Sequence, residues 1–238
     1  MDLDAALREA LAREGEPAYL LDRRGDIQFV NDAWDRAARA EGAPDRVHAE
    51  AIVGTNWLEG ICGKARRYYA AVLSRAFSLP LSTPPLALVH LTECNSPVTV
   101  RTVSHRFVPL FGERELSAGW VLVVHTPVAE TAADRHYAII HAGPSRYAQA
   151  DGNAHQCTAC RRTLTGADLS GEPRWEFAPA LISHPPEGTH WRICPDCRVR
   201  YFVKPSEEPL RHTVAARLPR SAGLWLSARQ LAVMRPTG

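Results

Sequence analysis

Residues 86–126, LALVHLTECNSPVTVRTVSHRFVPLFGERELSAGWVLVVHT, decide the fold of this 238-residue chain. Three runs within the stretch, 86–94, 98–111 and 118–126, are rich in valine, leucine, threonine and aromatic residues, which favour strands. The Asn-Ser-Pro of residues 95–97 and the Gly-Glu-Arg-Glu of residues 112–115 separate them and are typical of turns. The stretch therefore predicts three successive antiparallel strands.

The sequence before this stretch supplies two more strands and the helices. Residues 18–22 and 27–30 are short apolar runs on either side of a glycine-containing turn, which predicts a hairpin. Helices are predicted over residues 33–41 and 64–79, and the second ends before Pro80. The simplest architecture with this order is α+β: a five-stranded antiparallel sheet with helices on one face.

The order of two strands, helices and three strands over residues 16–127 resembles a PAS sensory domain. Three strings carry the resemblance: LDRRGDI (21–27), VNDAW (30–34) and VGTNWL (53–58). The CNSP of residues 94–97 is also similar to a turn between two late strands in one bacterial subgroup of PAS domains. The resemblance implies a sensor or interaction domain with a small-molecule pocket between sheet and helices.

Four cysteines in the second half of the chain stand in two tight pairs: Cys157 with Cys160, and Cys194 with Cys197. Each CxxC pair can direct two thiolates at one point, and two pairs complete a tetrahedral zinc site with no open coordination position. The surrounding ~50 residues bury too little apolar surface to fold comfortably without such a staple. The spacing therefore predicts structural Zn²⁺ in a zinc-ribbon-like module over residues 153–204.

The two pairs also have alternative interpretations. They could form disulfides or a redox pair, but a redox CxxC lies in a βαβ context that this sequence does not predict. Three histidines are candidate replacement ligands, although four cysteines already complete the shell: His155, His184 and His190. Four arginines flank the cysteines and could offset the charge of four thiolates: Arg161, Arg162, Arg192 and Arg198.

The cysteine-containing region resembles the cysteine-rich tail of certain bacterial PAS-containing signalling proteins. The similar strings are CTACRR (157–162), RWEFAP (174–179) and ICPDC (193–197). That pattern usually has Ser-His-Gly before its Ile/Leu-Cys-Pro string, whereas this chain has HWR (190–192), which displaces the histidine by one residue.

The remaining segments complete the predicted domain organisation. Residues 1–15 are predicted to form an amphipathic helix with leucines at positions 3, 7 and 11. Residues 16–127 form the PAS-like domain, and residues 128–152 form a connector that continues as a helix over 129–137. Residues 205–238 are a proline-containing tail whose sequence does not determine a fold.

No cofactor other than zinc is expected. A photoactive flavin domain has a cysteine where this sequence has Trp57, and haem-binding PAS domains often use a histidine on the long helix, which residues 64–79 lack. His90 and His105 are expected to be ordinary strand residues, and Cys62 and Cys94 to be buried or half-buried thiols.

Catalysis is not expected either. The sequence has no GxxxxGK[ST] phosphate loop, no GxSxG elbow and no HExxH motif. A zinc ion held by four cysteines has no position for an activated water. We therefore expect a protein that is not an enzyme.

Charge is divided unevenly along the chain. Residues 1–152 carry 16 basic and 19 acidic residues, which gives −3, and residues 153–238 carry 12 and 7, which gives +5. No apolar run approaches the ~20 residues that a membrane-spanning helix needs. The first four residues, MDLD, lack the basic and apolar regions of a signal peptide, so we expect a cytoplasmic location with reduced thiols.

Together these features predict a non-catalytic bacterial signalling protein in which a PAS domain is coupled to a structural zinc module that mediates interaction. One alternative is a transcription-associated zinc protein that binds nucleic acid through its basic half. Another is a thiol-based redox or zinc sensor. The expected partners are a second copy, through the amino-terminal helix and the PAS sheet, and an unidentified signalling protein. No membrane contact is expected.

Overall fold

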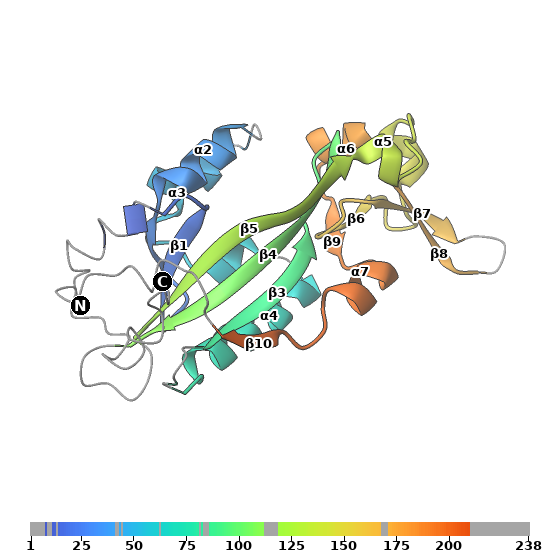
Figure 1. Ribbon diagram of the computed structural model, residues 1–238. Coiled ribbons are helices and arrows are strands. Elements are labelled where there is room, and N and C mark those ends of the chain that lie inside the picture. The colour runs from blue at the N-terminus through green and yellow to red at the C-terminus, as the bar shows by residue number, and fades with distance from the viewer. Residues whose placement is uncertain are drawn as a thin grey trace.

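The computed structural model describes residues 8, 11–12, 14–40, 43, 45–61, 63–80, 82, 86–111, 119–167 and 171–209. It shows a long twisted sheet with helices against one face, and a smaller unit at one end of that sheet (Figure 1). In the part of the chain just given, no helix is both long enough and apolar enough to cross a membrane.

The first part of the chain has the predicted order of two strands, helices and three strands. The strands are β1 (Ala18–Asp22), β2 (Ile27–Val30), β3 (Leu86–Glu93), β4 (Thr99–Leu110) and β5 (Trp120–Ala132). Between β2 and β3 lie α2 (Asp32–Ala40), η1 (Asp45–Val47), α3 (Ala49–Ile52), η2 (Trp57–Gly60) and α4 (Gly63–Phe77). These five strands pair antiparallel in the order β3-β4-β5-β1-β2. This is the PAS-like α+β fold that the sequence predicts.

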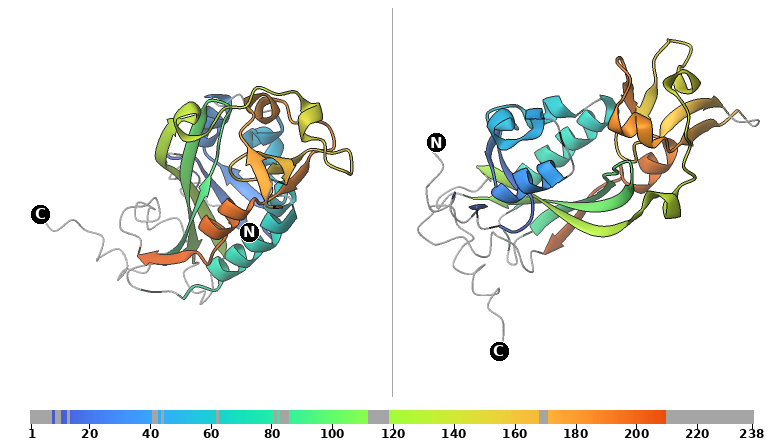
Figure 2. Two further views of the ribbon diagram at one scale, coloured as in Figure 1. Left: turned by 90° about the vertical axis from the view of Figure 1, so that its right-hand side faces the viewer. Right: turned by 90° about the horizontal axis from the view of Figure 1, so that it is seen from above.

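The helices lie on one face of the sheet, as the view from above shows (Figure 2, right). The buried residues of α4 recur every three or four positions and therefore share one side of the helix: Ala65, Tyr69, Val72, Leu73 and Ala76. They belong to one core with side chains from four of the strands: Leu21, Ile27, Leu88, Phe107, Val121 and Val123. This stripe explains why the long helix packs flat on the sheet.

A sixth strand extends the sheet beyond the five that the sequence predicts. β10 (Ser206–Pro209) pairs antiparallel with β3 at the edge of the sheet. Its residues, SEEP, are all exposed, so neither apolar alternation nor β propensity marks them as a strand. They pair through the backbone at an edge position, where a proline at the end is tolerated. The segment starting at residue 205 therefore has structure in its first part that the sequence alone did not determine.

The end of β5 also differs from the prediction. β5 continues six residues beyond the predicted end at Thr126, and only α5 (Ala133–His136) is helical in the segment 129–137. The reason is the length of β4, whose first residues pair with the extension of β5. The register shifts opposite Thr102 and Val103, which makes Val128 the extra residue of a bulge next to Pro127.

The smaller unit contains the two cysteine pairs. After η3 (Pro144–Tyr147) it consists of β6 (His155–Cys157), β7 (Thr163–Ala167), β8 (Pro173–Glu176), α6 (Pro179–Ser183), β9 (His190–Arg192) and α7 (Pro195–Arg200). The strand order is β8-β7-β6-β9, with β6 and β9 parallel and the other pairs antiparallel. All three views place this unit beyond one end of the long sheet (Figures 1 and 2).

Several sequence predictions fall outside the described residues: Leu3, Leu7, Cys62, the turn 112–115 and the tail from residue 210. Leu11 is described and is fully buried within the chain itself. This part of the predicted leucine stripe therefore packs within its own chain.

Candidate metal centre

The first cysteine pair lies in a tight turn after β6. The Arg161 N–H donates to the carbonyl oxygen of Cys157 at 3.1 Å, and the Cys157 N–H donates to the carbonyl oxygen of Arg162 at 2.8 Å. Arg161 has a φ of 61°, in the left-handed region that costs a non-glycine residue roughly 1–2 kcal/mol. This conformation reverses the chain directly after Cys160.

The second pair is held by a helix start. Cys194 precedes α7, and its Sγ accepts a hydrogen bond from the Cys197 N–H at 3.4 Å. Pro195 takes the first helical position, where a missing N–H breaks no helical hydrogen bond. The Cys194 N–H in turn donates to Sγ of Cys157 at 3.4 Å. Backbone donors thus reach two of the four sulfur atoms, where they stabilise negative charge.

A parallel strand pair brings the two halves together although 33 residues separate them in sequence. β6 and β9 lie side by side, with Cys157 opposite Arg192. The Thr158 N–H extends this pairing by donating to the carbonyl oxygen of Arg192 at 2.8 Å. Because β9 leads into Cys194 two residues later, the pairing places the second cysteine pair directly against the first.

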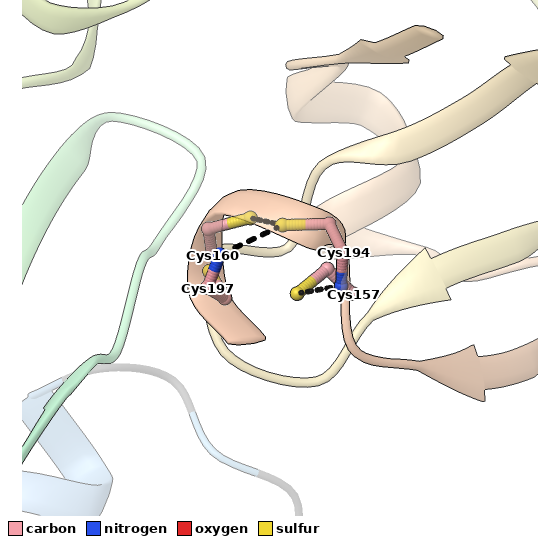
Figure 3. Close-up of side chains that lie close together, drawn as sticks. All are labelled: Cys157, Cys160, Cys194 and Cys197. Atoms are coloured by element: carbon pink, nitrogen blue, oxygen red, sulfur yellow. Dashed lines mark hydrogen bonds between the residues drawn. The ribbon is translucent and has the colours of Figure 1, made fainter. Parts of the chain in front are cut away.

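The four thiols converge (Figure 3). Their Sγ atoms lie within 4.8 Å of one another, all four cysteines are free, and each is at most 2 % exposed. A tetrahedral zinc ion with Zn–S bonds of ~2.3 Å sets its sulfur atoms ~3.8 Å apart. The distance between Sγ of Cys160 and Sγ of Cys194 is 3.7 Å. Donor type, spacing and burial therefore fit a metal such as zinc.

The thiols perturb one another strongly. Hydrogen bonds within the cluster lower the pKa of Cys157 and raise the pKa of Cys197. Four groups that each become anionic on ionisation repel one another at this distance, so some stay protonated. A divalent cation at the centre is the group that lets all four ionise together.

One of the four flanking arginines contacts the thiols. The Arg162 guanidinium donates from Nε to Sγ of Cys160 and from Nη2 to Sγ of Cys194, both at 3.3 Å, and its Nη2 also bonds Oδ2 of Asp196 at 2.7 Å. Arg161 instead lies over the ring of Trp191, 5.0 Å from its centroid. Arg192 and Arg198 are exposed.

The cysteine cluster is bonded to the PAS-like sheet at the end of β3. The side-chain amide of Asn95 donates to the carbonyl oxygen of Cys160 at 3.0 Å and to Oε2 of Glu93 at 2.9 Å. Glu93 is buried, with 4 % of its side chain exposed, and also accepts from the hydroxyls of Tyr137 and Tyr201, each at 2.9 Å. A single buried carboxylate therefore joins β3 to residues before and after the cysteine pairs.

A second connection starts inside the PAS-like domain. His90 on β3 bonds Tyr68 through Nδ1 at 2.9 Å and Tyr69 through Nε2 at 3.1 Å. The Tyr68 hydroxyl also donates to the carbonyl oxygen of Val203 at 2.7 Å, and Phe202 packs against both tyrosines and His90. β3 therefore contacts the carboxyl-terminal part of the chain through its middle, its end and its edge partner β10.

Three histidines form a row across the sheet. His90, His105 and His125 stand opposite one another on β3, β4 and β5. Burial lowers the pKa of His90 and of His125 to about 4, and burial together with the two neighbouring histidines lowers the pKa of His105 as well. Both ring nitrogens of His105 and Nε2 of His125 are shielded from solvent, without a hydrogen-bond partner in the described structure. Such unpaired polar groups are rare inside proteins, so these histidines are not the ordinary strand residues that the sequence suggested.

Other predicted residues have varied outcomes. Trp57 lies among aromatic side chains of the core, at 5.4 Å from Tyr69 and 5.8 Å from Phe107 between ring centroids. Cys94 is exposed rather than buried. The histidines considered as replacement ligands lie outside the four-thiol cluster: His155, His184 and His190.

Sequence reasoning missed the residues that join the two parts. Glu93 did carry a signal, because an acidic residue ends an otherwise mostly apolar predicted strand. Nothing in the sequence indicated that Tyr137 and Tyr201, 44 and 108 residues away, would be its partners.

Comparisons with known proteins support the fold and go no further. No family model matches the sequence, and no curated protein does. Among solved structures, the PAS domain of BvgS from Bordetella pertussis is 14% identical with a TM-score of 0.38, covering 52% of this chain and 84% of that one. A structure of RsLOV is 15% identical with a TM-score of 0.37, covering 52% and 66%. The PAS-B domain of Cycle from Drosophila melanogaster is 12% identical with a TM-score of 0.32, covering 47% and 98%.

Proposed function

We propose that this protein is a non-catalytic sensory relay protein in which a PAS-like domain controls the position of a structural zinc module. The module, over residues 153–204, holds Zn²⁺ through Cys157, Cys160, Cys194 and Cys197. The PAS-like fold suggests a signal-sensing role. The zinc module provides the surface that contacts a downstream signalling protein, and flavin or haem takes no part.

One observation carries the proposal: the hydrogen bond from Asn95 to the Cys160 carbonyl oxygen, with Glu93 behind it. Glu93 is the last residue of β3, and His90 lies three residues earlier on the same strand. A ligand or partner that shifts β3 changes contacts on both sides of the zinc module at once. A two-state arrangement of this strand is therefore the simplest route for a signal to pass between the two parts.

Burial of the thiols favours a structural zinc over a redox sensor. Reactive cysteines lie in partly exposed, electropositive surroundings. Here Arg162 supplies positive charge, but the four cysteines are at most 2 % exposed. An oxidant would first have to open the module.

The experiment measures coupling in both directions, since coupling between two sites is reciprocal. Asn95→Ala is expected to speed transfer of zinc from the protein to a chelator. Val98→Ala is the matched control, because this side chain belongs to the same turn and is 72 % exposed. Equal zinc-release rates in wild type and Asn95→Ala would reject the relay through this turn.

The reverse direction is read by hydrogen exchange. Removal of zinc is expected to raise amide exchange in β3 as well as in residues 153–204. A rise confined to the module would show that zinc stabilises only its own surroundings and would also overturn the relay.

A further inference from the structure

A second group of metal-binding side chains lies beside the four cysteines. His155 and His190 are the first residues of β6 and β9 and stand directly opposite each other in the parallel pair. Their rings are stacked, with an interplanar angle of 22° and centroids 5.1 Å apart. Asp151 precedes His155 by four residues, in the turn that leads into β6. The three side chains are thus brought together by the same strand pairing that assembles the cysteine cluster.

Three atoms of this group form a small triangle. Oδ2 of Asp151 lies 2.9 Å from Nε2 of His155 and 3.2 Å from Nδ1 of His190, and the two nitrogens are 3.3 Å apart. With metal–ligand bonds of ~2.1 Å, neighbouring ligand atoms lie ~3.0 Å apart in an octahedral site and ~3.4 Å in a tetrahedral one. All three observed distances fall at or near this range.

Hydrogen bonds alone satisfy this triangle poorly. If both histidines donate to the carboxylate, two N–H groups face each other across 3.3 Å. If His190 donates to Nε2 of His155 instead, that nitrogen has no proton to offer Asp151 at 2.9 Å. In either arrangement one of the three contacts is mismatched. A cation in front of the triangle removes the mismatch, because all three atoms then direct lone pairs at it.

The carboxylate is already oriented for this role. Its other oxygen, Oδ1, accepts a hydrogen bond from the Asn153 N–H at 3.0 Å. That bond leaves Oδ2 facing the two rings. Partners of this kind, which hold a ligand in its binding direction, are a regular feature of metal sites.

We propose that Asp151, His155 and His190 bind a divalent first-row cation such as Zn²⁺, in an open site separate from the four-cysteine centre. Two imidazoles and one carboxylate suit cations of this class. The side chains of Asp151 and His190 are 40 % and 52 % exposed, so solvent reaches the cation and fills its remaining positions. The site is therefore exchangeable, whereas the thiolate centre is closed.

The two sites differ in order of filling. His155 and Cys157 lie two residues apart on β6, so the strand pairing that the thiolate centre stabilises also places the triangle. The closed site fills first, and the open site then responds to the free metal concentration. This inference does not depend on the relay through Asn95.

The test uses the full-length, untagged protein carrying one zinc per chain, titrated with Zn²⁺ by calorimetry. Wild type is expected to bind a second equivalent. Asp151→Asn and His190→Ala are expected to weaken this second step by more than about 100-fold, because loss of an outer-shell partner alone costs 10–100-fold. Both variants should keep the first zinc, since neither residue belongs to the thiolate cluster.

His184→Ala is the matched control, an exposed histidine of the same module outside the triangle. It should keep both binding steps. Cobalt gives an independent readout: the second equivalent of Co²⁺ should add no sulfur charge-transfer absorption. Absence of a second step in wild type, or a second step unchanged in both variants, would show that the triangle is a hydrogen-bonded cluster only and would overturn the proposal.

Discussion

The side-chain amide of Asn95 bonds the carbonyl oxygen of Cys160 at 3.0 Å, so the turn after a sheet strand is joined directly to a predicted zinc ligand. The two residues lie 65 positions apart in sequence. Because both groups are buried, the bond is lost only if the module moves away from the sheet. The relationship makes the stability of the module depend on the sheet, and several predictions follow from this dependence and from the surrounding chemistry.

Replacement of a zinc ligand should unfold the module. Cys194→Ser removes one of four thiolates and the cap of α7, and structural zinc contributes an apparent ~10–16 kcal/mol to folding in small zinc modules. The variant is expected to lose stoichiometric zinc and amide protection over residues 153–204. Elemental analysis and hydrogen exchange measure the two effects. Cys94→Ser, an exposed thiol outside the cluster, should change neither.

Arg162 should protect the thiolates. Arg162→Ala removes two hydrogen bonds to sulfur and is expected to raise the rate of zinc extraction about tenfold, the lower end for a partner that contacts metal ligands. Arg161→Ala is the neighbouring control, because that side chain contacts the Trp191 ring rather than sulfur. A similar rate in both variants would mean that general charge, and not the hydrogen bonds, controls zinc release.

Glu93 should be the most sensitive contact between sheet and module. Glu93→Ala leaves the donors of Asn95, Tyr137 and Tyr201 without their acceptor in a buried place. A loss of about 3 kcal/mol in the free energy of unfolding is expected, since each buried unsatisfied group costs roughly 1–3 kcal/mol. Chemical denaturation measures it. Glu130→Ala, at the half-exposed ion pair with Arg101, should cost no more than ~1 kcal/mol.

The histidine row should make stability fall in acid. The folded-state pKa values of His90 and His125, about 4, lie below the ~6.5 of an unfolded histidine. Between these values the unfolded chain binds more protons, so the free energy of unfolding decreases as pH falls from ~6.5 to ~4. The expected slope is at most roughly 1.4 kcal/mol per pH unit for each histidine. Denaturation midpoints across this range test it.

His105→Phe separates this effect from general acid sensitivity. The substitution removes two buried ring nitrogens without partners and one of the three titrating groups. We expect a gain of roughly 1–3 kcal/mol at neutral pH and a shallower pH dependence. His136→Gln, at an exposed position, should leave the slope unchanged. Destabilisation by His105→Phe at neutral pH would indicate that the His105 nitrogens have partners after all.

The sequence predicted the features that depend on short spacing. Two strand-like runs, the long amphipathic helix and three further strands gave the PAS-like α+β order, since period and turn residues are properties of neighbouring positions. The two CxxC pairs identified the four thiols that the structure brings within 4.8 Å, because each pair fixes its own geometry. The boundaries were less certain, and β5 passed its predicted end because the long β4 offered it a partner.

The sequence by itself therefore determined which elements form and which four cysteines converge. Only the tertiary structure decided that residues 206–209 become the sixth strand, that Glu93 and Asn95 bond the module, and that Asp151 lies against His155 and His190. The physical reason is that these contacts join residues through strand register and docking of one part on another. Such contacts leave no periodic trace in the sequence, because a glutamate, an asparagine or a histidine has the same local preferences whether or not a distant partner meets it.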